Sequence, residues 1–463
     1  MYTSCYFQPI TRIVMSSPTR WTSRTSFIFA TAAAAIGLGN IWRFPYLAGQ
    51  NGGGVFVLLY LLFVILLGVP LMTSEVLLGR IGRGNPALAL QNVASIIKRS
   101  RHWRILGGMT IAAGYLILTY YVVIAGWVLD YFVRGLLGQF HNTTHSSMIA
   151  NFKALQANPW QMIVTDTFIV GATMAVIVLG IKRGLERTVR FMFPALIILM
   201  LILVAYGMTT GYFHHALVFL FKPDFHRVTA RIALLALGQA FFSLNIAMGI
   251  IIMFGAYLPD DIPIVSSVIA VCLADTAIAL LAGLVIFPVV FANHLTPDSG
   301  PSLIFQTLPL AFSQIPFGNV FGALFFLLLL FAAFTSTISL LEPAVAWLIE
   351  NHHFSRNKAV ALLGFICWVL SFGTILSFSH APHFNHLGFT FFQGIDFLTS
   401  DIMLPLSGLL IAVFSGWLLP TTLIQKTLGW NPHNFWFWCW RWSKRYFAPI
   451  AIGLILLMSL RIL

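Results

Sequence analysis

The sequence predicts an all-α polytopic membrane protein, and three observations support that fold class. The chain has 463 residues, of which 59% are hydrophobic and only 8% are charged, and its mean hydropathy is +0.89. Its apolar residues form long runs, and its basic residues gather in a few of the short connections between those runs. Soluble domains do not have this composition, whereas proteins with many membrane-spanning helices do.

The apolar runs are long enough for eleven transmembrane helices, since one crossing needs about 20 mainly apolar residues. The predicted helices lie near residues 26–48, 54–79, 105–137, 160–181, 187–210, 232–257, 262–292, 317–349, 357–379, 395–420 and 444–463. The basic connections are the N-terminal tail, 80–104, 182–190, 352–358 and 426–445. They all fall on one side only if every run crosses once, which places the N-terminus inside and the C-terminus outside.

The remaining connections and the charge distribution refine this topology. The connections at 138–159, 211–231 and 293–316 would be external, and they are long enough to carry short helices. The formal net charge is +13, but the basic residues lie between membrane segments, so we expect a lipid bilayer and no nucleic acid as partner. The four cysteines show neither a disulfide framework nor the spacing of a zinc site.

Two of the predicted helices, 26–48 and 232–257, are interrupted near the middle of the membrane. The interrupting residues are Gly37, Gly39 and Asn40 in the first helix, and Ser243, Asn245 and Gly249 in the sixth. Each helix would begin a unit of five helices, and with five helices between their starts the two units must be inverted. Glycine can also simply pack membrane helices closely, but paired interruptions in two halves indicate the midplane site of a secondary transporter.

Five longer stretches of the chain are distinctive. They are "WTSRTSFIFATAAAAIGLGNIWRFPYLAGQNGGGVF", "GVPLMTSEVLLGR", "GQAFFSLNIAMG", "GPSLIFQTLP" and "FAAFTSTISLLEP". They resemble the neurotransmitter:sodium symporter family, bacterial branch, and the resemblance extends to the end of the tenth helix. It implies a cytoplasmic tail at 1–25, a transporter core at 26–420 with inverted repeats at about 26–210 and 232–420, and a cytoplasmic loop with helix 11 at 421–463.

The resemblance also implies a function. We expect a sodium-coupled symporter that imports a neutral, hydrophobic or aromatic amino acid by alternating access across the bacterial inner membrane. No covalent bond changes in such a cycle, so the chain would not be an enzyme and would need no organic cofactor. A homodimer is one assembly that this chain could form. Two alternatives remain open, namely an osmolyte or amine transporter with the same fold and a non-transporting amino-acid sensor.

The substrate site is expected between the two broken helices. By resemblance, its residues are Ala34, Ala35, Gly37, Leu38, Gly39, Ile117, Tyr121, Phe242, Ser243, Asn245, Met248, Ser336 and Leu340. The N–H groups of Leu38 and Gly39 and the Tyr121 hydroxyl would hold the substrate carboxylate, because half-helix N-termini attract anions. Taken alone, Tyr121 could be an ordinary core tyrosine. The pocket would be mostly apolar, although Asn245 could instead accept a polar side chain.

The resemblance implies two Na⁺ ions, each held by the oxygen ligands that hard cations prefer. The first site would use Ala35, Asn40, Ser243 and Asp275 with the substrate carboxylate, and the second Ala33, Ile36, Ala332, Thr335 and Ser336. Because the carboxylate would complete the first site, ion and substrate would bind with a reciprocal coupling energy. Taken alone, "TSTIS" at 335–339 could equally be polar packing between helices.

Asp275 is a carboxylate inside the predicted helix 262–292, where such a group is costly and indicates function. Many relatives have Asn here, and chloride-dependent ones use a nearby Ser whose position is Ala279 in this chain. A fixed carboxylate can replace the charge of chloride, so we expect chloride-independent transport, with proton antiport if Asp275 is reprotonated. Asp401, one turn deeper than Asp396, could face a water-filled vestibule or a proton path.

The remaining matched residues belong to gates and to a brace. Arg43 with Asp396 is the expected outer gate, Trp21 and Glu350 belong to the inner gate, and Glu75 would brace the broken sixth helix. Relatives usually have Arg three residues before Trp21, where this chain has Pro18. Arg20 or Arg24 is therefore expected to pair with Glu350 instead.

Overall fold

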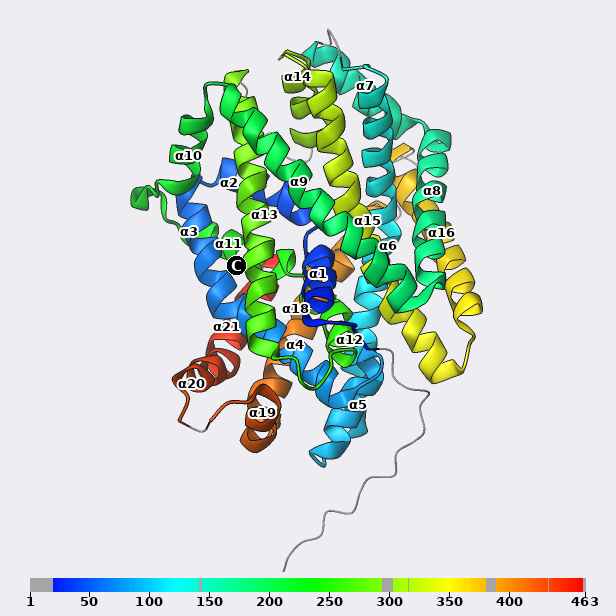
Figure 1. Cartoon of the computed structure of the whole chain (residues 1–463), viewed down its shortest axis with the longest axis vertical. Helices are drawn as coiled ribbons and strands as arrows, with labels where there is room; N and C mark the ends of the chain where they lie inside the picture. Colours follow the sequence, from blue (N-terminus) through cyan, green and yellow to red (C-terminus); the bar gives the residue numbers. More distant parts are fainter. Residues whose placement is uncertain are drawn as a thin grey trace, which may run out of the picture.

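The computed structural model describes residues 20–140, 144–293, 303–314, 316–379, 389–431 and 433–460. Every regular element in these ranges is a helix, which confirms the predicted all-α class. Figure 1 shows most long helices running roughly along the long axis of the molecule. Most of the predicted tail at 1–25, including Pro18, lies outside the described residues.

The first predicted helix is broken, as the interruption in its sequence indicates. α1 (Arg24–Ala35) stops before Gly37, and the chain continues as η1 (Gly39–Arg43) and α2 (Phe44–Gln50), which are bent from α1 by 56°. α1 starts at an N-cap serine, Ser23, whose side chain accepts the Ser26 N–H. Such a cap satisfies one of the backbone donors that a helix N-terminus leaves free.

The other helices of the first half are continuous or joined through π-helical turns. They are α3 (Gly54–Phe63), η2 (Val64–Gly68), α4 (Val69–Gly82), α5 (Pro86–Ile96), η3 (Arg101–Trp103), α6 (Arg104–Leu136), α7 (His145–Ala157), α8 (Pro159–Val178), η4 (Ile181–Glu186) and α9 (Arg187–Thr209). The first three form one helix over Gly54–Gly82, and η4 with α9 forms another over Ile181–Thr209.

The second half repeats the broken helix. α11 (Ala230–Ser243) and α12 (Ile250–Ala256) replace the predicted helix 232–257 and are separated by residues 244–249. The other elements are α10 (Phe213–Phe221), η5 (Phe225–Arg227), α13 (Ile264–Ala292), η6 (Leu303–Thr307), α14 (Leu308–Ser313), α15 (Gly318–His352), α16 (Arg356–Ser379), α17 (Phe391–Asp396), η8 (Phe397–Met403), α18 (Leu404–Val413), η9 (Phe414–Leu418), α19 (Thr421–Leu428), α20 (Phe435–Trp442), η10 (Ser443–Phe447) and α21 (Ala448–Ser459).

The structure confirms the fold class but not the predicted number of membrane crossings. Within the described residues, eight helices are long and apolar enough to cross a membrane, and α1 with its bent continuation would be a ninth. α11 is also apolar but shorter, because the second break ends it. The eleven predicted crossings therefore stay a prediction.

The centre and the periphery of the bundle differ in what surrounds their side chains. All seven residues of α12 are buried, and α1 lies near the middle of the molecule in Figure 1. On α8, at the edge of the bundle, Trp160, Val164 and Phe168 are all more than half exposed. Such a large exposed apolar surface indicates contact with lipid.

Short helices mark the two ends of the bundle. α7 and α14 lie at one end of the molecule in Figure 1, and α5, α19 and α20 lie at the other. α7, α10 and α14 belong to the three long connections in which the sequence allows short helices. We call the end near α5 and α19 the inner end and the end near α7 and α14 the outer end.

Candidate functional site

The first broken helix leaves backbone groups that side chains satisfy. Ile36 ends α1 in an extended conformation, with φ −72° and ψ 99°. Beyond it, the Gly37 N–H donates to Asn40 Oδ1 at 3.4 Å, and the Leu38 N–H donates to the Tyr121 hydroxyl at 3.2 Å. The break thus presents N–H donors on one side and the carbonyl end of α1 on the other, which carry opposite partial charges.

The second broken helix holds an unusual backbone in residues 244–249. Asn245, Ala247 and Gly249 have positive φ angles of 50°, 68° and 78°. Non-glycine residues in this region are strained and persist only where their surroundings hold them. Two contacts do so here: Glu75 Oε1 accepts the Ala247 N–H at 2.7 Å, and the Asn245 side chain donates to the Ala34 carbonyl.

The two breaks, together with α6 and α15, surround one pocket. Its lining consists of Ala35, Gly37, Leu38, Gly39, Asn40, Ile117, Tyr120, Tyr121, Phe242, Ser243, Asn245, Met248, Ser336 and Leu340. These include every residue predicted for the substrate site except Ala34, whose carbonyl accepts a hydrogen bond from the lining residue Asn245. Tyr120 is an addition, and its only sequence signal is its position beside Tyr121.

Glycine is required where α1 ends because hydroxyl groups come very close to it. A Cβ atom on Gly37 would lie 2.9 Å from both Ser336 Oγ and Tyr121 Oη. These hydroxyls and the neighbouring backbone supply polar groups to the pocket lining around Gly37. Ile117 and Met248 are among the side chains that make the rest of its lining apolar.

The residues predicted for the first sodium site form a buried polar network. Asn40 Nδ2 donates to Asp275 Oδ1 at 2.8 Å, and the Tyr60 hydroxyl donates to Asp275 Oδ2 at 3.4 Å. Tyr60 also lies 3.3 Å from the Ser243 hydroxyl. Asn40, Asp275 and Tyr60 are fully buried. The sequence gives no signal for Tyr60, since it lies in an uninterrupted apolar run.

The residues predicted for the second sodium site lie between α1 and α15. The Thr335 hydroxyl donates to the carbonyls of Ala33 at 2.9 Å and Ala332 at 3.1 Å, and the Ser336 hydroxyl donates to Ala332 at 3.1 Å. Ile36 lies at the end of α1, directly before the break. The structure therefore brings together a buried set of carbonyl and hydroxyl oxygens, which is the donor chemistry of a hard cation.

The outer end of the pocket does not contain the expected ion pair. The Arg43 guanidinium carbon lies 4.7 Å from the centre of the Phe242 ring, and no ion pair within 4.0 Å joins it to Asp396. Asp396 Oδ1 instead accepts hydrogen bonds from Tyr120 at 3.2 Å and from Ser400 at 2.8 Å. In this conformation Arg43 and Asp396 make no ion pair, because other partners occupy both groups, so the predicted outer gate stays a prediction.

The inner end is closed around Trp21. Its indole N–H donates to the Phe254 carbonyl at 2.9 Å, and its backbone N–H donates to the Tyr257 carbonyl at 3.1 Å. The indole also packs edge-on against both of those aromatic rings. Nearby, Glu350 accepts hydrogen bonds from the backbone and the side chain of Asn85, at 2.6 and 2.8 Å.

The expectation that Arg20 or Arg24 pairs with Glu350 is wrong. Arg20 lies 3.7 Å from Asp260, and Arg24 donates to the hydroxyls of two serines at the start of α13. Glu350 is satisfied by Asn85, the N-cap of α5, whose free backbone N–H attracts a carboxylate. The predicted role of Glu350 in the inner gate stays a prediction, with Asn85 as its partner in place of an arginine.

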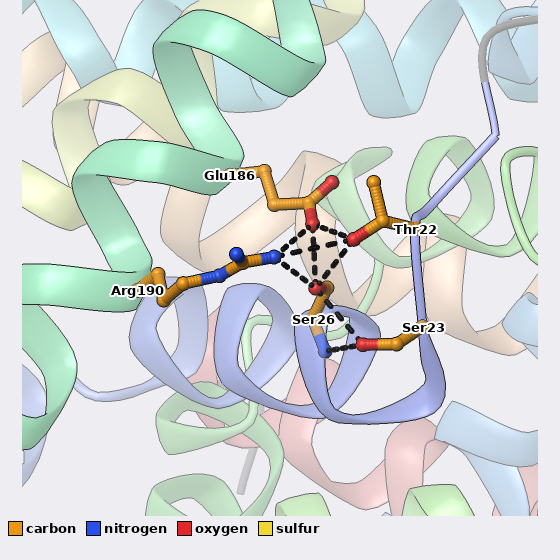
Figure 2. A network of polar contacts seen from close by, with 5 residues as sticks. All are labelled: Thr22, Ser23, Ser26, Glu186 and Arg190. Carbon is orange, nitrogen blue, oxygen red and sulfur yellow. Dashed lines mark hydrogen bonds and ion pairs between the residues drawn. The ribbon is translucent and has the colours of Figure 1, made fainter.

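A second inner contact was missed by the sequence reasoning. Figure 2 shows the Glu186 carboxylate, at the end of η4, facing Thr22 and Ser26 at the start of α1, with Arg190 beside it. Glu186 Oε1 accepts from both hydroxyls and from Arg190 at 2.8 Å. Glu186 is buried, whereas the Arg190 side chain is 63% exposed. The network ties the start of α1 to η4 and α9.

Comparisons with known proteins agree with this architecture. Residues 19–156 and 137–462 match the model of the sodium:neurotransmitter symporter family. An uncharacterized sodium-dependent transporter, YhdH of Bacillus subtilis, is 35% identical over 96% of this chain and 98% of its own length. An uncharacterized sodium-dependent transporter of Haemophilus influenzae is 31% identical over 95% of this chain and 98% of its own.

A solved structure is similar over nearly the whole chain as well. The crystal structure of MhsT in complex with L-phenylalanine superposes with a TM-score of 0.86 and 36% sequence identity, and covers 95% of this chain and 99% of that one. The predicted resemblance is thus confirmed. The chain belongs to the sodium:neurotransmitter symporter family and is a sodium-dependent membrane transporter, not an enzyme.

Proposed function

We propose that this transporter imports a neutral amino acid with a hydrophobic or aromatic side chain, by sodium-coupled symport and alternating access. The observation that carries the proposal is the division of the pocket. The hydroxyls of Tyr121 and Ser336 lie against Gly37 in the first break, whereas Met248 and Leu340 lie together against Gly114 on α6. An α-amino acid has the same division, with its charged groups at one end and its side chain at the other.

The substrate carboxylate would bind the N–H groups that follow the first break. The Leu38 N–H already points at the Tyr121 hydroxyl, so a carboxylate oxygen could accept from both. N–H groups at a helix N-terminus favour an anion. The substrate amine would face carbonyl groups on the other side of the two breaks, where the partial charge is negative.

The side-chain end of the pocket favours an apolar group. Asn245 is the polar residue that could accept a polar side chain, but its amide already donates to the Ala34 carbonyl. Because that amide is engaged within the protein, the pocket offers it less readily to a substrate. The similar structure with bound L-phenylalanine supports the same choice.

Two sodium ions would couple to the substrate. The first would bind among Asn40, Ser243 and Asp275 beside the substrate carboxylate, and the second among the oxygens between α1 and α15. An ion that shares an oxygen with the substrate raises its affinity, and the substrate raises that of the ion by the same factor. Each positive charge that enters down a membrane potential of 100 mV contributes about 2.3 kcal/mol.

Transport would not need chloride. Asp275 is fully buried and accepts hydrogen bonds from Asn40 and Tyr60, and Ala279, one turn further along α13, offers no hydroxyl for an anion. The carboxylate would supply the negative charge next to the first sodium ion. We expect uptake to change by no more than about twofold when gluconate replaces chloride. The loss of a coupled ion site would change uptake much more. Strict chloride dependence would contradict this assignment.

The proposed orientation follows the basic connections. The inner end, with α5, α19 and α20, would face the cytoplasm of a bacterium, and the N-terminus would lie on that side of the inner membrane. The repeats at about 26–210 and 232–420 would move against each other around the pocket. Closure of Arg43 toward Asp396 would seal the outer end before the inner half of the first helix opens.

Uptake into proteoliposomes with an imposed sodium gradient tests the proposal. The panel should hold L-phenylalanine, L-leucine, L-glutamate, L-lysine, a quaternary-ammonium osmolyte and a monoamine. We expect sodium-dependent accumulation of the neutral apolar amino acids alone. Accumulation of the osmolyte or the amine would favour the first alternative, and a compound that binds without accumulating would favour a sensor.

A further inference from the structure

Lys444 is a buried cation that the proposed transport cycle does not use. It lies in η10, at the start of the last helical segment, and it is fully buried. Its Nζ atom has no hydrogen-bond partner among the residues that the structure describes. Burying a charge is costly unless another charge compensates for it, so the position of the nearest carboxylate indicates what the lysine does.

Glu75 provides that carboxylate. It is fully buried as well, and while its Oε1 atom accepts the Ala247 N–H at 2.7 Å, its Oε2 atom has no partner within the described ranges. Within the described residues no ion pair shorter than 4.0 Å joins Glu75 and Lys444, but the two groups lie close enough to attract each other electrostatically. In the described part of the chain, no other charged side chain contributes to the electrostatic environment of either group.

Hydrogen bonds fasten the segment of the lysine to the helix of the carboxylate. The Trp440 indole N–H donates to the Pro70 carbonyl at 3.2 Å. Ser443, directly before the lysine, donates to the Leu66 carbonyl at 2.6 Å. The carboxylate lies little more than one helical turn beyond Pro70. Two helices far apart in the sequence therefore hold the cation and the carboxylate in one buried region.

We propose that Lys444 is a positioning residue of the substrate pocket: its charge balances that of Glu75 and thereby keeps the carboxylate on the Ala247 N–H. Ala247 belongs to the unwound segment 244–249, whose backbone is strained and whose side chains supply part of the pocket lining. The last helix, which lies outside the two proposed repeats, would in this way set the shape of the pocket. Only the transport arm of the test rests on the proposed function.

Replacing the lysine alone should disturb the unwound segment. Lys444→Met leaves a buried carboxylate without its balancing charge, which is strongly unfavourable. We expect amide hydrogen exchange in 244–249 to become on the order of tenfold faster, and kcat/KM for L-phenylalanine uptake to fall by a similar factor. Lys444→Arg keeps the charge in a larger side chain, so it should change both measurements less than Lys444→Met does.

Removing both charges should restore most of the slow amide exchange in 244–249. In the double variant Lys444→Met with Glu75→Gln, the glutamine oxygen can still accept the Ala247 N–H. Its exchange rate in 244–249 should return to within about threefold of Glu75→Gln alone. Lys426→Met is the matched control, because Lys426 is an exposed lysine on α19, and it should change neither quantity.

The experiment is hydrogen exchange by mass spectrometry on the full chain in nanodiscs, with uptake measured in parallel. Unchanged exchange in Lys444→Met, faster exchange across all helices alike, or no recovery in the double variant would each overturn the proposal. If Lys444→Met does not fold, the double variant tests the proposal in its place, since the proposal requires the double variant to fold. Exchange needs no substrate, so failure of the wild type to take up L-phenylalanine would contradict only the proposed function.

Discussion

At the inner end of the pocket, Trp21 and Glu350 each make two hydrogen bonds, whereas at the outer end Arg43 rests on Phe242 at 4.7 Å. The inner contacts are directional and join distant parts of the chain. At the outer end, one cation–π interaction holds Arg43, and Asp396 accepts a hydrogen bond from the distant Tyr120 and one from Ser400 on its own helix.

This difference indicates which end of the pocket is closed by stronger contacts. A hydrogen bond contributes about 0.5–1.5 kcal/mol to stability, and a cation–π contact of a partly buried arginine such as Arg43 about 0.5–2 kcal/mol. Trp21 and Glu350 make four such bonds at the inner end, whereas the outer end has the Arg43 contact and one hydrogen bond between distant segments, from Tyr120 to Asp396. In this conformation the inner end is therefore held by more contacts than the outer end.

The largest loss of uptake is expected from a substitution of Trp21, at the inner end. Trp21→Ala removes an indole hydrogen bond and two aromatic contacts, so the inner end should open and the start of α1 should exchange its amide hydrogens faster. Losses of this kind cost about 3–5 kcal/mol, and we expect uptake to fall by at least tenfold. Trp436→Ala, at a 69% exposed tryptophan, is the control and should transport normally. Equal uptake by the two variants would mean that Trp21 does not hold the inner end.

A smaller effect is expected at the outer end. Asp396→Asn keeps an acceptor for Tyr120 and Ser400 but removes a charge that attracts Arg43. Asp401 also attracts Arg43 and would retain part of that attraction. KM for L-phenylalanine should rise roughly threefold, with little change in the amide exchange of α1. A loss as large as that of Trp21→Ala would mean that the two ends are equally fastened.

The smallest effect is expected at Glu186. Its ion pair with Arg190 joins residues one helical turn apart, and the arginine is mostly exposed, so the pair itself contributes about 0–1 kcal/mol. Glu186→Gln retains an oxygen for the hydroxyls of Thr22 and Ser26, which face it in Figure 2. Uptake should drop by no more than about twofold. A tenfold drop, measured in the same vesicles, would make this network the main inner closure in place of Trp21.

The sequence was sufficient for the features that depend on composition and local interruption. Long apolar runs predicted the all-α membrane fold, and glycine with asparagine predicted the breaks at residues 36–38 and 244–249. Most of the substrate residues could be named because they lie in long matched stretches, whereas Ile117 and Tyr121 lie outside those stretches and were assigned by position. The pocket lining then brings all of them together except Ala34, although their roles stay predictions.

Partners contributed by distant segments could not be read from the sequence. Tyr60 reaches Asp275 from an apolar run that looks like any membrane helix. Asn85 satisfies Glu350 because it caps α5, and nothing local distinguishes that cap as a gate contact. Arg43 was expected on Asp396 by resemblance, but which partner an arginine takes depends on the conformation of the whole bundle.

The central claim is that sodium binds beside the pocket between the two breaks and drives uptake. Asn40 is the residue on which this depends most directly, since its side chain reaches both the Gly37 N–H and Asp275 Oδ1. The decisive measurement is sodium-gradient-driven L-phenylalanine accumulation by Asn40→Ala in proteoliposomes, at membrane levels equal to the wild type. We expect no sodium-driven accumulation above the no-gradient background, and accumulation equal to that of the wild type would contradict the account.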